Sequence, residues 1–308
     1  MSEPRLSLGS RFLYFIFRLL RLVGANKLFD RAAGDRSVVV ELAPKARRFD
    51  TRKPPRAVKR GRRHEEIDIE GSTMHVLGNE GRRVILYLHG GGYLIGPSQQ
   101  HWSALTDVGD QTGADVAMFL YPRIPEVDHA EIIASTLSAY EYLATRYGAS
   151  NIVVAGDSAG GGLTATLLLH LRHREIEQPH AAVLISPWLD LALSDPAALA
   201  QEQSDLMLTV SGIRAIGTHY AGEFRGTDDA LISPVHASLE GLAPMHVFVG
   251  TDELFLADAR TFAKRAEVDG AELTLREMPR GQHVAAIFNT REGRAARAQM
   301  AALIGWPA

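Results

Sequence analysis

The chain of 308 residues contains no cysteine, which excludes disulfides, thiolate-bound zinc and a cysteine nucleophile. It also has no apolar run long enough to span a bilayer. The best candidate, residues 8–23, is interrupted by Arg11, Arg18 and Arg21, and these arginines also argue against a cleaved signal peptide. We therefore expect a cytoplasmic protein that can still touch a membrane from one side.

A uniformly basic surface is missing as well. The net charge is −3, but residues 1–63 carry an excess of 12 positive charges and residues 64–308 an excess of 15 negative charges. An acidic body repels phosphate backbones, so we expect no nucleic-acid partner. The basic arm can dock on its own acidic body or on an anionic surface.

The N-terminal segment is present as an amphipathic pattern. Arg11, Tyr14, Arg18 and Arg21 recur at helical spacing and form one polar stripe, with apolar residues on the remaining surface. Such a helix must bury a broad apolar face. It either packs over the body of the chain as part of a lid or lies in a membrane interface, and the two arrangements are compatible.

The body of the chain alternates between short apolar runs and helical patterns. Residues 64–78 read as an extended pair, and later strands are expected near 84–88, 116–120, 152–155, 182–185, 246–250 and 273–275. Helices are expected over 98–112, 129–147, 159–174, 255–269 and 284–303. This alternation predicts an α/β fold with a mostly parallel sheet and helices on both faces.

Three parts follow from this pattern. We expect residues 1–63 to form an N-terminal cap segment and basic linker, and residues 64–190 together with 231–308 to form the α/β core. Residues 191–230 break the rhythm of strands and helices, and we interpret them as an insertion that crosses the top of the sheet.

The strongest chemical signal is Gly156-Asp157-Ser158-Ala159-Gly160, which lies between a buried strand and a helix. Such a turn holds the serine hydroxyl above the sheet, and the following helix directs its backbone N–H groups toward a developing anion. A second signal, His89-Gly90-Gly91-Gly92, directly follows the strand at 84–88. Its glycines allow the backbone to approach a substrate, as an oxyanion hole requires.

An acid and a base should follow the serine in that order, each at a strand end. Asp252 follows the strand at 246–250, and His283 lies after the last strand. We therefore assign Ser158 as nucleophile, His283 as base and Asp252 as orienting acid, with Glu253 and Asp258 as rivals for the acid. The histidine should give a rate that rises through roughly pH 6–7.

These motifs resemble the hormone-sensitive-lipase-like branch of the α/β-hydrolases, which includes many bacterial carboxylesterases. Ser186-Pro187-Trp188-Leu189-Asp190 and the combination of Asp252-Glu253-Leu254 with Asp258 add to the resemblance. The resemblance implies a helical cap over the pocket and an oxyanion hole formed by the amides of Gly91, Gly92 and Ala159. It also implies that His89 orients the glycine loop without titrating.

The expected function is therefore that of a serine carboxylesterase that hydrolyses small esters with short to medium acyl chains through an acyl-enzyme. A lipase, an amidase or a deacetylase could use the same machinery, and a non-catalytic receptor on this fold is a further alternative. No cofactor and no metal are expected, and a site at His170 and His173 is set aside in favour of a solvated helix face. Helix 284–303 offers either a homodimer surface or a solvated face bearing Arg291, Arg294 and Arg297.

Overall fold

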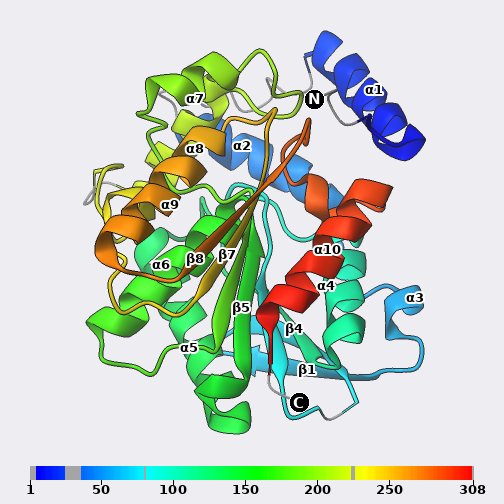
Figure 1. Cartoon of the computed structure of the whole chain (residues 1–308), viewed down its shortest axis with the longest axis vertical. Helices are drawn as coiled ribbons and strands as arrows, with labels where there is room; N and C mark the ends of the chain where they lie inside the picture. Colours follow the sequence, from blue (N-terminus) through cyan, green and yellow to red (C-terminus); the bar gives the residue numbers. More distant parts are fainter. Residues whose placement is uncertain (1–4, 25–35, 80, 223–225, 307–308) are drawn as a thin grey trace.

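One sheet organises the chain in the computed structural model, which describes residues 5–24, 36–79, 81–222 and 226–306 (Figure 1). Within these residues the sheet has eight strands, in the order β1-β2-β4-β3-β5-β6-β7-β8. Strand β2 runs antiparallel to β1 and β4, and the other pairings are parallel. The strands are β1 (Arg63–Ile69), β2 (Ser72–Gly78), β3 (Val84–Leu88), β4 (Asp115–Leu120), β5 (Ile152–Asp157), β6 (Ala181–Ile185), β7 (Met245–Gly250) and β8 (Leu273–Met278).

Helices cover both faces of this sheet, as Figure 1 shows. They are α1 (Leu8–Leu22), α2 (Arg36–Ala46), α3 (Arg56–Lys59), α4 (Gln99–Thr112), α5 (His129–Tyr147), α6 (Ala159–His173), α7 (Pro196–Gln201), α8 (Val210–Ala221), α9 (Leu256–Asp269) and α10 (Arg291–Ile304). Helices α5, α6 and α9 share one apolar core with the sheet, whereas α4 and α10 share the other. The central strands β3, β5 and β6 are buried along their whole length, which explains their continuous apolar sequences.

Several elements gather above the carboxyl ends of the parallel strands. Helices α7 and α8, from the segment that interrupts the strand–helix alternation, lie at this end together with α1 and α2 (Figure 1). Helix α1 is held at its start by Glu292 on α10, whose carboxylate accepts hydrogen bonds from the hydroxyls of Ser7 at 2.6 Å and Ser10 at 2.7 Å. Further along α1, Phe17 packs on Phe288 with ring centroids 5.6 Å apart. The amphipathic helix expected at the N-terminus therefore rests on the core of the protein.

Two expectations about the last helix are corrected. It begins at Arg291, not at residue 284, because Val284 has a φ of 51° and Thr290 caps the helix by accepting from the Gly293 N–H at 3.1 Å. Arg297 is also not part of a solvated face. It is buried, and its guanidinium contacts the Asp107 carboxylate on α4 at 2.6 Å and the Ala286 carbonyl at 2.7 Å.

Part of the basic N-terminal arm docks on the acidic body, one of the two arrangements expected from the charge pattern. Arg47 forms a two-pronged ion pair with Glu126, with N–O distances of 2.7 and 2.8 Å. Arg123 of the body reaches back to Asp50 at 2.7 Å. Among the described helices, none is both long and apolar enough to cross a membrane.

Candidate active site

Ser158 occupies the turn between β5 and α6. Its backbone has φ 54° and ψ −121°, a conformation that residues other than glycine rarely adopt. Its N–H donates to the Ile185 carbonyl at 2.9 Å. The neighbouring glycines are required by space. A Cβ on Gly160 would lie 1.9 Å from the Leu88 carbonyl oxygen, and one on Gly156 would lie 2.2 Å from the Gly160 carbonyl oxygen. The backbone of the turn is strained, and the close packing around it fixes the position of the Ser158 hydroxyl.

The structure brings Ser158 and His283 together across 125 residues of sequence. The Nε2 atom of His283 lies 2.9 Å from the Ser158 Oγ, within hydrogen-bond distance. The two side chains are almost fully buried. An imidazole in this position can take the hydroxyl proton when the oxygen attacks an electrophile.

The carboxylate beside His283 belongs to Glu253 and not to Asp252, so the sequence assignment of the acid is corrected. Glu253 Oε1 lies 3.5 Å from His283 Nδ1, and its other oxygen accepts hydrogen bonds from Ser186 Oγ at 2.7 Å and from the Gly250 N–H at 3.0 Å. Asp252 is half-buried, and its carboxylate accepts instead from the Thr251 hydroxyl at 3.2 Å. The side chains of Asp252 and Glu253 point in different directions in this turn, so only Glu253 faces the imidazole of His283.

The sequence alone does not separate Glu253 from Asp252, because both carboxylates follow the same strand, β7. The structure separates them, since Glu253 is fully buried and Asp252 is half-buried. The role of Ser186, which the sequence offered only as part of a motif, was not predicted. Its hydroxyl donates to Glu253 and accepts from the Val284 N–H at 3.0 Å, and thereby links the acid to the loop that carries His283. The other rival, Asp258, is buried in α9, where desolvation and the charges of Asp190 and Asp195 raise its pKa to about 8.

The charge environment favours the protonated imidazole. Burial is the largest single influence and would lower the pKa of His283, but the carboxylates of Glu253, Asp205 and Asp157 together outweigh it, so that the pKa lies above its ordinary value of 6.5. The base form of His283 is consequently reached at a higher pH than for an ordinary imidazole.

The glycine loop is held against the serine turn by Asp157. This buried carboxylate accepts from the Gly90 N–H at 2.9 Å, from Tyr87 Oη at 2.8 Å and from His101 Nε2 at 3.2 Å. Burial opposes its charge, but these donors, led by His101, hold its pKa below the usual value. Asp157, the residue before the serine in the motif, thus fixes the position of the glycine loop of residues 89–92.

Three backbone N–H groups around Ser158 remain available. Gly91 and Gly92 have φ values of 118° and 62°, and a Cβ on Gly91 would lie 2.4 Å from the Ile95 carbonyl oxygen. Among the hydrogen bonds of the described residues, none engages the N–H of Gly91, Gly92 or Ala159. These positions are the ones that the family resemblance implies for an oxyanion hole.

His89 takes no part as a titrating group at neutral pH. It is fully buried, stacks on Tyr121 with ring centroids 4.4 Å apart, and contacts the Gly90 carbonyl through Nδ1 at 2.8 Å. Desolvation lowers its pKa to about 3, so the ring is neutral. Its contacts hold the backbone of the glycine loop in place.

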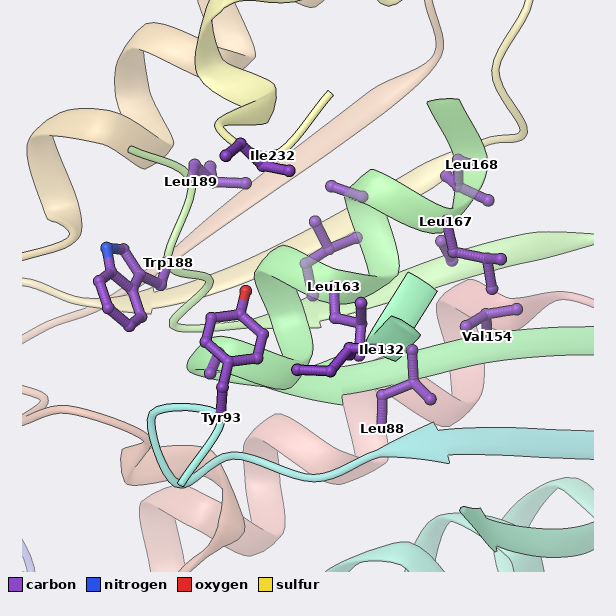
Figure 2. Close-up of a cluster of buried hydrophobic side chains, with 14 of the residues drawn as sticks. Leu88, Tyr93, Ile132, Val154, Leu163, Leu167, Leu168, Trp188, Leu189 and Ile232 are labelled. Carbon is purple, nitrogen blue, oxygen red and sulfur yellow. The ribbon is translucent and has the colours of Figure 1, made fainter. Parts of the chain in front are cut away.

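Aromatic side chains form the wall beside these groups. Figure 2 shows Tyr93, which follows the glycine loop, and Trp188 on neighbouring segments, with Leu163, Leu167 and Leu168 of α6 to their right. The rings of Tyr93 and Tyr220 stack at 3.7 Å, Trp188 stacks on Phe255 at 6.1 Å, and Phe255 meets His283 edge-on at 5.1 Å. Ser158 and His283 are therefore bordered on this side by mostly apolar aromatic surface.

The loop that bears His283 is hydrogen-bonded to residues 204–206 and to helix α1. The Gln282 side chain accepts from the Leu206 N–H at 2.8 Å and donates to the Ser204 carbonyl at 3.0 Å, and its backbone N–H donates to Tyr14 Oη at 3.2 Å. Arg21 of α1 reaches the Glu202 carbonyl at 3.0 Å and also the Asp205 carbonyl. Helix α1 thus contacts both the loop that carries His283 and the segment of residues 202–205.

Comparisons with known proteins agree with this fold. A family model for the alpha/beta hydrolase fold matches residues 85–287. An acetyl-hydrolase from Streptomyces hygroscopicus is 35% identical over 66% of this chain and 68% of its own length. An esterase from Acinetobacter venetianus is 30% identical over 67% of this chain, which spans slightly less than two thirds (66%) of that relative.

Solved structures extend the likeness over most of the chain. A hormone-sensitive lipase from a metagenome library aligns over 94% of this chain and 97% of its own, with a TM-score of 0.78 and 27% identity. An esterase/lipase from an uncultured bacterium covers 88% of this chain and 98% of its own, with a TM-score of 0.74 and 25% identity. The sheet order, the family match and these neighbours confirm the resemblance found in the sequence, and the chain belongs to the α/β-hydrolase family as an enzyme related to bacterial esterases and hormone-sensitive lipase.

Proposed function

We propose that this chain is a serine carboxylesterase in which Ser158 is the nucleophile, His283 the general base and Glu253 the acid that orients the imidazole. The contact that carries the proposal is the 2.9 Å approach of His283 Nε2 to Ser158 Oγ, with Glu253 on the far side of the ring. The serine oxygen attacks the ester carbonyl carbon while its proton moves to Nε2. The carbonyl oxygen becomes an oxyanion, which the N–H groups of Gly91, Gly92 and Ala159 stabilise.

The second half of the reaction reuses the same groups. The protonated imidazole gives its proton to the departing alcohol, which leaves an acyl group on Ser158. Water then donates a proton to His283 and attacks the acyl carbon, and Ser158 leaves with the proton returned from the imidazole. Glu253 holds the ring orientation and stabilises the imidazolium throughout, because its charge lies on the Nδ1 side.

The enclosed site favours a small acyl group. Tyr93, Trp188, Tyr220 and Phe255 fill the space around the reactive groups, and on α8 Ile216 approaches the glycine loop so closely that a Cβ on Gly92 would lie 3.6 Å from it. The acetyl-hydrolase name of one relative points in the same direction. We propose esters of short acyl chains as substrates, under a cap formed by α1, α7 and α8.

A series of p-nitrophenyl esters tests this assignment. We expect kcat/KM to be highest for acetate to hexanoate and to fall at least tenfold by dodecanoate, since longer chains must displace buried aromatic rings. Emulsified triacylglycerol and an amide panel run beside the series distinguish a lipase, an amidase or a deacetylase. Equal or greater kcat/KM for the longest ester would contradict the short-chain proposal while leaving the esterase assignment intact.

We also propose that α1 rests on an anionic lipid surface. Its outer side exposes a continuous apolar group, and the exposed fractions of Leu8, Phe12 and Leu22 are 80%, 66% and 81%. Arg11 and Arg18 are exposed on the same helix, which has no acidic residue. An apolar face bordered by arginines fits the interface of a membrane that contains negatively charged lipids.

Vesicle flotation tests the role of α1. The double variant Phe12→Glu/Phe15→Glu should bind vesicles that contain phosphatidylglycerol at least tenfold more weakly than the unaltered chain, because it loses apolar area and adds repelling charge. Val268→Glu, which alters an 82% exposed valine on α9, is the matched control and should bind as before. Absence of vesicle binding by the unaltered chain would contradict the proposal, as would a dimer in light scattering that the double variant abolishes.

A further inference from the structure

A cluster of metal-ligating side chains lies on the hairpin of β1 and β2. In the antiparallel register Glu66 is directly opposite His75, and His64 precedes Glu66 by two residues on the same strand. Side chains two residues apart on a strand, and those directly opposite, share one face of a sheet. The hairpin therefore presents two imidazoles and one carboxylate on a single face.

The ligating atoms converge. His64 Nε2 lies 3.1 Å from His75 Nδ1, and His75 Nδ1 lies 3.8 Å from Glu66 Oε2. The three ligand atoms all fall within 4.8 Å of one another. Zinc holds nitrogen and oxygen ligands at about 2.0–2.2 Å, so neighbouring ligands of one tetrahedral ion are roughly 3.3 Å apart. The two imidazoles already have this spacing, and a small rotation of the exposed Glu66 side chain supplies the third ligand.

His75 is oriented before any ion arrives. Its side chain is buried against Trp102 of α4, with ring centroids 5.8 Å apart. The ring also hydrogen-bonds to the backbone of Arg52, and Nδ1 faces His64. A backbone partner on the second ring nitrogen is the usual support of a metal-ligating histidine. His64 and Glu66 are exposed, so an ion can enter from solvent.

We propose that His64, Glu66 and His75 bind one divalent transition-metal ion, Zn²⁺ or Cu²⁺, with water completing its coordination. Two nitrogens and one carboxylate oxygen suit these ions and not Mg²⁺, which prefers oxygen ligands. Lys53 and Lys59 act electrostatically on His64 and oppose a cation, so we expect micromolar affinity and not a tighter one.

The ion fastens the edge of the sheet and does not reach the catalytic groups. Strand β1 is an edge strand, and a ligand set shared with β2 clamps it in register. Strands β4 and β3 separate β2 from β5, which places the cluster roughly 14 Å or more from the serine turn. The site is thus independent of the esterase proposal, and its test does not depend on activity.

The experiment uses the full chain without a histidine tag. Calorimetric titration with Zn²⁺ should show one ion per chain, and Cu²⁺ should quench part of the tryptophan fluorescence because Trp102 lies against His75. His64→Ala should weaken Zn²⁺ binding at least tenfold and abolish the rise in Tm that Zn²⁺ gives the unaltered chain. Trp102→Phe should remove the Cu²⁺-dependent quenching without removing binding.

Controls make the outcome decisive. His64 is exposed, so its replacement tests binding without disturbing the core, whereas Glu66→Gln should weaken binding by a smaller factor. His173→Ala, which removes an exposed histidine at the end of α6, is the matched control and should bind Zn²⁺ unchanged. Equal Zn²⁺ affinity in His64→Ala and the unaltered chain overturns the proposal, and so does binding seen only at millimolar Zn²⁺.

Discussion

Replacing Ser158 by alanine is expected to lower kcat for p-nitrophenyl acetate by roughly 10⁴-fold or more, because no other group in the proposed mechanism can form the acyl-enzyme. The hydroxyl contacts His283 Nε2 at 2.9 Å, and the Cβ at this position is already accommodated by the turn. The variant should therefore fold, with a Tm within a few degrees of the unaltered chain. Steady-state assay, circular dichroism and thermal unfolding measured together check both parts.

The result would be informative in either direction. Residual turnover close to that of the unaltered chain would contradict the nucleophile assignment. Loss of activity together with loss of the folded spectrum would point to the turn and not to the chemistry. In that case Ser158→Cys, which keeps a polar group in the same place, should restore the fold while ester turnover remains far below normal.

Glu253→Gln is expected to lower kcat/KM by roughly 10³- to 10⁴-fold, whereas Asp252→Asn should change it less than about threefold. Glutamine keeps an oxygen for the Ser186 hydroxyl and the Gly250 N–H, so the turn stays supported. It removes the negative charge beside Nδ1, so the imidazolium loses its main stabilising partner. The two substituted residues are adjacent in the sequence, but only Glu253→Gln removes the charge beside His283.

The pH profile separates a catalytic effect from a structural one. The carboxylate raises the pKa of His283 above 6.5, so the acid limb of kcat/KM should lie above pH 6.5 in the unaltered chain. With the carboxylate gone, burial is less opposed and the limb should move to lower pH, while Asp252→Asn leaves it in place. An unchanged limb in Glu253→Gln, or a large loss in Asp252→Asn, would return the acid role to Asp252.

The central strands and the serine turn could be predicted because their sequences leave few alternatives. Val84–Leu88 was located without error, since a short run that is apolar at every position fits a strand buried on both faces. The glycines of the serine turn and of the 89–92 loop are spatial necessities, and such positions are visible in a single sequence.

The acid and the last helix could not be predicted for the opposite reason. Asp252 and Glu253 are both carboxylates after the same strand, and only the direction of each side chain in the turn distinguishes them. The segment after His283 has helical periodicity, but the left-handed backbone of Val284 delays the helix to Arg291. Local backbone geometry determines both the side chain that faces His283 and the start of α10, and the periodicity of the sequence does not reveal that geometry.

The docking of α1 depended on contacts that span the whole chain. Tyr14 meets Gln282, and Ser7 meets Glu292, more than 260 residues away in each case. The amphipathic pattern predicted a helix with a face to bury, but which residues faced the core was decided by partners that no local window contains. The apolar residues left outside are those that the lipid proposal uses.

Rapid mixing with p-nitrophenyl acetate, followed by acid quench and mass spectrometry of the digested chain, tests the central claim most directly. We predict a transient mass increase of one acetyl group on the peptide that contains Ser158, with a burst of p-nitrophenol close to one equivalent per chain when deacylation is the slower step. An adduct formed at the working pH should persist longer after a jump to low pH, where protonated His283 cannot activate water for deacylation. Turnover of the ester with no acetylated peptide, or with the acetyl group on another residue, would contradict the account.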